Sequence, residues 1–213
     1  MPLDPDLART RLEEARIYVL LTRQLCRLDP LLVLEECLDA GADLVQVREL
    51  QLPDRELLEW VHDVRERCAK HRVPVIVNDR ADIALLAGAD GVHVGQTDLP
   101  PRAVRELFGK DLLVGLSIHG HHQIRESADE PVDYIGIGPV FDTETKGVEG
   151  HGAAWLKELL PEATLPAFGV GGIDLETVDD AVAAGLDRIA VSSAICGAES
   201  PRSVIDALRE ALA

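Results

Sequence analysis

The stretch VPVIVNDRADIALLAGADGVHVGQTDLP, residues 73–100, decides the fold. Two short apolar runs within it, Val75–Val77 and Gly91–Val94, each end abruptly in polar residues, and one short helical pattern separates them. A buried strand, a helix and a second buried strand form a βαβ unit, in which the two strands are parallel. Asp79 and Asp98 follow the two strands, so both carboxylates emerge at the same edge of the sheet. Two acids and a neighbouring amide at that edge indicate a metal-assisted site.

Apolar runs of strand length recur along the whole chain at fairly even spacing. They are short, rich in Val and Ile and not alternating, which is typical of strands buried on both faces. The predicted strands are Ile17–Leu21, Asp43–Val47, Val75–Val77, Gly91–Val94, Leu112–Leu116, Tyr134–Ile137, Ala167–Val170 and Arg188–Val191. The predicted helices are Pro30–Ala40, Pro53–His71, Ala81–Ala87, Pro100–Phe108, His121–Ala128, Ala153–Leu160, Leu175–Ala184 and Pro201–Leu212, and several begin with proline, a good helix start signal.

This alternation predicts a (βα)8 TIM barrel, an α/β fold of a single domain that spans residues 1–213. Residues 1–16 are predicted to be an N-terminal helical extension, with a helix over residues 5–16 that closes the bottom of the barrel. The alternative is a doubly wound open sheet, which requires a glycine-rich turn after the first strand. That position reads Thr22-Arg23-Gln24 and offers no phosphate loop.

Composition limits the classes of partner. The net charge is −17, so we expect neither nucleic acid nor an anionic membrane as a general partner. The N-terminus has no apolar signal region, and the four cysteines show no C-x-x-C spacing, which together predict a cytoplasmic protein with free thiols. Small-molecule substrates are the expected partners, and the sequence leaves a homo-oligomer open.

Function in a barrel of this kind lies in the loops that follow the strands. Seven predicted strand ends carry groups suited to an anion and a cation. Gly171-Gly172 and Ser192-Ser193 follow the last two strands, where glycine lets backbone N–H groups approach an anion closely and a helix N-terminus adds a favourable dipole. These segments predict a phosphate site, and a tight turn that merely requires glycine is the alternative. The other groups are Gln46, Arg48, Asn78, Asp79, Gln96, Asp98, Ser117, His119, Thr143, Thr145 and Lys146.

Asp79 and Asp98 are predicted to hold Mg²⁺, because carboxylates, water and substrate phosphate oxygens are its usual ligands. Capping of the helices that follow is the alternative for each acid. His119, His121 and His122 lack the spacing of a helical zinc pair, so a structural metal is not predicted there.

These motifs resemble the family of thiamine phosphate synthase and the related thiazole tautomerase. The resemblance covers roughly Tyr18 to Pro201. It rests on the motifs Val45-Gln46-Val47-Arg48-Glu49, Val77-Asn78-Asp79-Arg80, Gly91 to Pro100, Gly115 to His119, Gly136 to Phe141, Thr143-Glu144-Thr145-Lys146, Gly169 to Ile173 and Val191 to Ile195.

The resemblance implies a transferase that joins hydroxymethylpyrimidine diphosphate to thiazole phosphate and releases pyrophosphate. It assigns the pyrimidine diphosphate to Gln46, Arg48, Asn78, Ser117 and Lys146, and Mg²⁺ to Asp79 and Asp98. It assigns the thiazole phosphate to Thr143, Thr145, Gly172, Ser192 and Ser193. Arg48, Lys146 and Ser117 are thereby implied to be catalytic, through neutralising the leaving group and holding the reactants close.

One position departs from the family pattern. The synthases usually read R-E-K after the second strand, whereas this chain reads Arg48-Glu49-Leu50 and lacks one diphosphate cation, which Arg80 or Arg23 could replace. The glycine-rich stretch 145–152 is also closer to the tautomerase branch, in which His119 is the expected proton-transfer group and no metal is needed. Synthase activity is the prediction, because the metal acids and Thr145-Lys146 are present. The tautomerase and a non-catalytic phosphate-binding relative are the alternatives.

Overall fold

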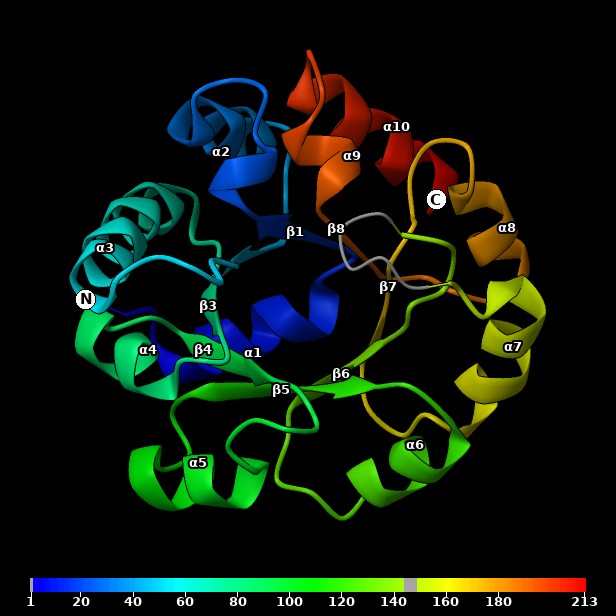
Figure 1. The fold of residues 1–213 in the computed structure, drawn as a ribbon, viewed down its shortest axis with the longest axis horizontal. Helices are drawn as coiled ribbons and strands as arrows, with labels where there is room; N and C mark the ends of the chain where they lie inside the picture. The colour runs from blue at the N-terminus through cyan, green and yellow to red at the C-terminus, as the bar shows by residue number, and fades with distance from the viewer. Residues whose placement is uncertain (1, 144–148) are drawn as a thin grey trace.

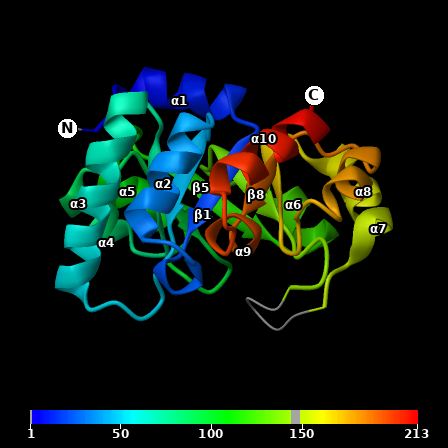
Figure 2. The same ribbon diagram turned by 90° about the horizontal axis from the view of Figure 1, so that it is seen from above.

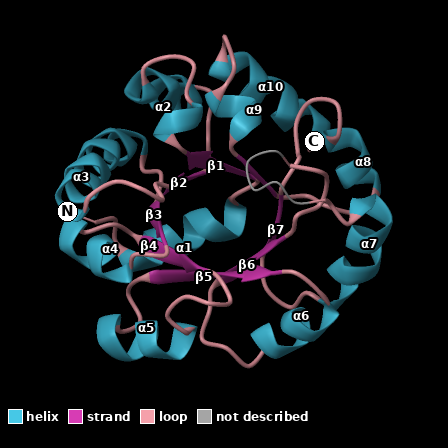
Figure 3. Cartoon of the chain, in the orientation of Figure 1, coloured by secondary structure: helices cyan, strands magenta, loops and turns pink. Residues whose placement is uncertain are grey.

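The computed structural model describes residues 2–143 and 149–213, and these form a closed barrel of eight parallel strands in sequence order (Figures 1 and 3). β1 pairs with β2 and with β8, which closes the ring. This architecture confirms the predicted TIM barrel. The strands are β1 (Ile17–Leu21), β2 (Leu44–Val47), β3 (Val75–Asn78), β4 (Gly91–Val94), β5 (Leu113–Ile118), β6 (Tyr134–Ile137), β7 (Ala167–Val170) and β8 (Ile189–Val191).

Helices surround the barrel and follow the strands. They are α1 (Pro5–Glu14), α2 (Pro30–Asp39), α3 (Asp54–His71), α4 (Ala81–Ala87), α5 (Pro101–Phe108), α6 (His121–Ser127), α7 (Gly152–Leu159), α8 (Val178–Ala183), α9 (Ser193–Cys196) and α10 (Pro201–Ala211), with 3-10 turns η1 (Arg23–Leu25) and η2 (Leu160–Glu162). In the described ranges 2–143 and 149–213, no helix combines the length and the apolar character that crossing a bilayer requires.

The main departure from the predicted boundaries is at α8, which begins at Val178 rather than at Leu175. The Asp174 carboxylate accepts hydrogen bonds from the backbone N–H groups of Glu176 and Thr177. These local bonds hold residues 174–177 in a turn and delay the helix. The short helix α9 was not predicted from the sequence.

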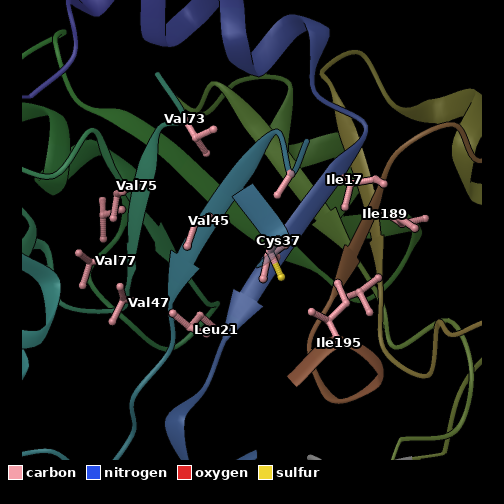
Figure 4. Close-up of a cluster of buried hydrophobic side chains, with 14 of the residues drawn as sticks. Ile17, Leu21, Cys37, Val45, Val47, Val73, Val75, Val77, Ile189 and Ile195 are labelled. Carbon is pink, nitrogen blue, oxygen red and sulfur yellow. The ribbon is translucent and has the colours of Figure 1, made fainter. Parts of the chain in front are cut away.

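Both faces of the strands are buried, each in its own core. One core lies between the strands and the surrounding helices and includes Ile17, Val45 and Val75 (Figure 4). The other fills the inside of the barrel and includes Tyr18 and Leu44. Side chains of one strand alternate between the two cores, which is why the strands read as continuous apolar runs.

Helix α1 lies across one end of the barrel, as the two perpendicular views show (Figures 1 and 2). The Asp4 carboxylate caps it by accepting from the N–H groups of Asp6 and Leu7. Ala8 and Leu12 of α1 belong to the inner core with Tyr18 and Leu44. The helix therefore shields this end of the inner core from water and leaves the opposite end open for chemistry.

This arrangement predicts that Leu12→Ala lowers the free energy of unfolding by about 3 kcal/mol, because it removes a buried leucine and leaves a cavity. Leu12 is 3% exposed. Leu86→Ala is the matched control, since Leu86 is a helical leucine that is 67% exposed, and it should change stability by less than about 0.5 kcal/mol. Urea unfolding followed by circular dichroism measures both values. Equal, small effects would show that α1 does not seal the barrel.

Candidate active site

A cavity of about 410 Å³ lies at the carboxyl ends of the strands. This volume falls within the range of small-molecule sites. Its walls come from the ends of β2, β5, β6, β7 and β8, and much of the predicted anion site meets there. The predicted residues that line it are Arg48, Ser117, His119, Thr143, Gly171, Gly172, Ser192 and Ser193. His151, for which sequence analysis predicted no role, also lines it and stacks on Trp155 at a ring distance of 4.3 Å.

The turn after β7 is shaped by two glycines. Gly171 and Gly172 have φ values of +93° and +65°, which side-chain-bearing residues rarely adopt. A Cβ on Gly172 would lie 2.4 Å from the carbonyl oxygen of Asp142. Glycine is thus required both by the backbone conformation and by the close approach of the loop after β6. The result is a half-buried turn whose backbone lines the cavity wall.

Ser192 and Ser193 have different environments in this wall. The Ser192 hydroxyl donates to the carbonyl oxygen of Leu20 at 2.9 Å, so its proton is engaged within the protein. Ser193 is the first residue of α9 and is exposed. The Ser193 hydroxyl is therefore the better placed of the two to donate to an anion.

Asn78 and Asp79 lie at the end of β3, next to the cavity-lining strands. The Asn78 amide donates to Asp79 Oδ2 at 2.6 Å. Asp79 has a φ of +61°, and its backbone N–H donates to the carbonyl oxygen of His93 at 2.8 Å. These bonds hold Asp79 at the end of the strand. Its backbone adopts the left-handed conformation, which is uncommon for residues other than glycine and is found most often at functional sites.

Asp98 lies in the exposed turn after β4, the neighbour of β3. Its Oδ2 accepts a hydrogen bond from the Gly95 N–H at 2.7 Å. Neither Asp79 nor Asp98 caps a helix, because the N-cap residues of α4 and α5 are Arg80 and Pro100 and neither cap has a side-chain bond. Helix capping thus does not account for the two acids.

The two acids are suited to Mg²⁺, judged by their chemistry. They supply hard oxygen donors from adjacent strand ends, and no group of three or more His, Cys, Asp or Glu side chains in residues 2–143 and 149–213 could hold a metal. Two carboxylates would leave the other positions around such an ion to water and to other oxygen donors, which is the usual environment of Mg²⁺. Closed zinc sites require four protein ligands, which is more than Asp79 and Asp98 supply.

Gln46 and His119 are held by hydrogen bonds of different kinds. The Gln46 amide is buried within the barrel and donates to the Tyr18 hydroxyl at 2.8 Å. His119 donates from Nδ1 to the carbonyl oxygen of Gly138 at 2.6 Å, and its backbone N–H donates to the Gln123 side chain. Because Nδ1 carries the proton, Nε2 of a neutral His119 is an acceptor. Thr145 and Lys146 lie outside the described residues.

His93, on β4, is a residue that the sequence analysis did not single out. Its Nε2 lies 3.0 Å from Ser117 Oγ, and its Nδ1 lies 3.2 Å from the Tyr134 hydroxyl. His93 therefore contacts a cavity residue directly. The only sequence signal was a histidine in a strand that is otherwise apolar.

Leu50 is 65% exposed and lines a second cavity of about 250 Å³ together with Arg48 and Glu49. Burial raises the pKa of the Glu49 carboxyl, which accepts a hydrogen bond from the Arg23 N–H.

The Arg23 guanidinium lies over the Trp60 ring, at 5.3 Å from its centroid. Arg80 pairs with Asp82 and Asp54 at 2.7 and 2.6 Å. Both arginines thus have other partners, and nothing in these contacts brings them to the position of the absent lysine.

Known proteins resemble this chain over nearly its whole length. The family model described as thiamine monophosphate synthase matches residues 17–195. The thiamine-phosphate synthase of Leptospira biflexa is 38% identical over 205 residues, which cover 91% of this chain and 95% of that protein. That of Halalkalibacterium halodurans is 36% identical over 176 residues, which cover 82% of this chain and 83% of that protein.

A solved structure agrees with these sequences. Thiamine phosphate pyrophosphorylase from Pyrococcus furiosus superposes with a TM-score of 0.84 at 30% identity and covers 96% of both chains. The resemblance predicted from the motifs is therefore confirmed. The chain belongs to the thiamine monophosphate synthase family, whose members are transferase enzymes of thiamine biosynthesis.

Proposed function

We propose that the cavity binds hydroxymethylpyrimidine diphosphate and thiazole phosphate together and joins them into thiamine phosphate and pyrophosphate. The observation that carries the proposal is one cavity that holds both Arg48 and the glycine turn Gly171-Gly172. A chain of net charge −17 that gathers anion-binding groups in a single cavity is suited to two anionic substrates. The names of the relatives also support this reaction.

The chemistry requires bond breaking before bond making. The bond between the pyrimidine methylene carbon and the diphosphate oxygen breaks, and pyrophosphate leaves with the electron pair. The thiazole nitrogen then donates its lone pair to the pyrimidine-stabilised carbocation and forms the C–N bond. No protein nucleophile is needed, so catalysis rests on charge neutralisation and on holding the reactants close.

The predicted roles divide between the two substrates. Arg48, Lys146 and Ser117 neutralise and orient the diphosphate, with Gln46 and Asn78 beside the pyrimidine. Gly171, Gly172 and Ser193 hold the thiazole phosphate through backbone N–H groups and a hydroxyl. The family resemblance assigns Ser192, Thr143 and Thr145 to the same phosphate. Asp79 and Asp98 would hold Mg²⁺, which when bound neutralises part of the charge on the diphosphate.

The tautomerase alternative rests on Leu50, on the glycine-rich stretch and on His119. The synthase names of the relatives support the transferase instead. An isomerase would also have no use for Asp98, which does not cap a helix here. The two activities remain distinguishable, because only the transferase releases pyrophosphate.

One prediction from the proposed function concerns Asp79 and Asp98. Purified protein supplied with both substrates should release pyrophosphate only when Mg²⁺ is present. Asp98→Asn should lower kcat/KM about a hundredfold and raise the Mg²⁺ concentration needed for half activity, because it removes one anionic ligand.

Asp82→Asn is the matched control for this experiment. Asp82 is another exposed aspartate near these strand ends. Its carboxylate forms an ion pair with Arg80, and Asp82 does not line the cavity. Its loss should leave activity within about twofold of the parent, as for an exposed ion pair. Absence of pyrophosphate release by the parent protein with Mg²⁺ and both substrates would sink the transferase proposal.

Another prediction concerns Leu50, which lines a cavity together with Arg48. Leu50→Lys adds a cation near the expected diphosphate and should lower the KM for that substrate by roughly tenfold, the value of one charge-assisted contact. Leu107→Lys, at a leucine on α5 that is 68% exposed, makes the same change of net charge away from the cavity and should leave this KM unchanged. Steady-state kinetics with the pyrimidine substrate varied separates the two. An equal fall in both variants would assign the effect to net charge alone.

A further inference from the structure

A chain of hydrogen bonds crosses the inside of the barrel and ends at the cavity. The Gln46 amide on β2 donates to the Tyr18 hydroxyl on β1 at 2.8 Å. The Tyr18 and Tyr134 hydroxyls lie 2.9 Å apart. From Tyr134 on β6 the chain continues to His93 Nδ1 at 3.2 Å, and from His93 Nε2 to Ser117 Oγ at 3.0 Å. Of the residues in this hydrogen-bond chain, Ser117 is the one that lines the cavity.

The hydrogen-bond chain depends on the packing around Gly115. His93, Gly115 and Tyr134 are paired across β4, β5 and β6, so they lie at the same level of the barrel. A Cβ on Gly115 would lie 2.4 Å from His93 Nδ1 and 2.2 Å from Tyr134 Cζ. The missing side chain at position 115 thus leaves the room in which His93 and Tyr134 meet.

The direction of the protons follows from the donors available. Tyr18 and Tyr134 are buried, and burial raises the pKa of both phenols, so each keeps its single proton. The Tyr18 oxygen accepts from Gln46, and the Tyr134 oxygen is the partner that the described residues offer to the buried Tyr18 proton. We infer that Tyr18 donates to Tyr134, because the reverse direction would leave the Tyr18 proton without an acceptor. The Tyr134 proton is then directed to His93 Nδ1, which must be an acceptor.

A neutral histidine whose Nδ1 accepts carries its proton on Nε2. His93 Nε2 consequently donates to Ser117 Oγ. Because the Ser117 oxygen accepts this bond, its own proton is left for an acceptor in the cavity. Every bond in the chain points the same way, and hydrogen bonds in series in a low-dielectric interior strengthen one another.

We propose that this chain makes His93 a positioning residue that holds Ser117 as a hydrogen-bond donor toward an oxygen of the leaving diphosphate. The inference rests on the proposed function for the identity of the acceptor, but the proton positions are independent of it. A donor aimed at an oxygen that gains negative charge stabilises the transition state more than the bound substrate. His93 acts through Ser117, so its contribution disappears when Ser117 is absent.

A double-mutant cycle tests this coupling. His93→Leu and Ser117→Ala should each lower kcat about thirtyfold with KM changed less than threefold, and the double variant should be no slower than Ser117→Ala alone. His93→Gln keeps a donor near the serine and should recover at least a third of the parental kcat. His62→Leu, at an exposed histidine on α3, controls for the loss of an imidazole and should leave kcat unchanged. Losses that multiply in the double variant would assign His93 a role separate from Ser117.

The protonation of the ring tests the same inference without any activity. Nitrogen-15 NMR of the parent protein, with the His93 signals identified by their absence in His93→Gln, should show the proton on Nε2. Tyr134→Phe removes the donor to Nδ1 and should shift His93 toward the other tautomer, whereas His62→Leu should not. A proton on Nδ1 in the parent protein would overturn the proposal. Absence of pyrophosphate release would overturn only the proposed function, because the ring signals do not depend on turnover.

Discussion

The closed ring of backbone hydrogen bonds from β1 round to β8 is the constraint on which the rest of the structure depends. Closing the ring pairs Ile17 with Ile189 and so brings the first strand, β1, beside the last strand, β8. The same closure brings the Ser192 hydroxyl within hydrogen-bond distance of the Leu20 carbonyl oxygen, and both residues line the cavity. Parallel strands that follow one another round a ring also send every carboxyl end to one side. The site is therefore a consequence of topology before it is a consequence of any particular side chain.

The inside of the barrel changes character along its axis. Near the end that α1 covers, the inward positions are apolar residues such as Leu44 and Leu113, and Leu12 of α1 packs with them. Further along come Gln46, His93 and Ser117, which require hydrogen-bond partners because they lie in a largely buried environment. Tyr18 and Tyr134 lie between the two regions, since their rings join the inner core and their hydroxyls join the hydrogen-bond chain. The apolar inner core near α1 and the polar residues near the cavity are thus packed together without a break.

The fold was largely predictable because both faces of each strand are buried and the helix ends repeat. The positions of Arg48, Gly172 and Ser193 followed from the rule that function lies after the strands, and the structure brings these residues to one cavity. His93 could not be found in that way, because it stands inside an apolar run rather than after it. Its partners Ser117 and Tyr134 are 24 and 41 residues away and reach it only through the pairing of β4, β5 and β6. The start of α8 was missed for a local reason, since the side chain of Asp174 competes with the helix for backbone N–H groups.

Electrostatics adds a requirement that the fold alone does not meet. A protein of net charge −17 repels anionic substrates at long range, so the attraction must come from cations that lie close to the cavity. Arg80 and Arg105 are engaged by carboxylates at 2.6 and 2.5 Å, which leaves them little to offer a ligand. Arg48 lines the cavity, and within the described ranges its guanidinium forms no ion pair closer than 4 Å. Leu50 contributes no charge beside Arg48, so under the proposed function Arg48 would supply a larger share of the attraction for a diphosphate than one cation of a pair. The polarised chain that ends at Ser117 supplies a donor of partial charge from the interior, where solvent screening is weakest.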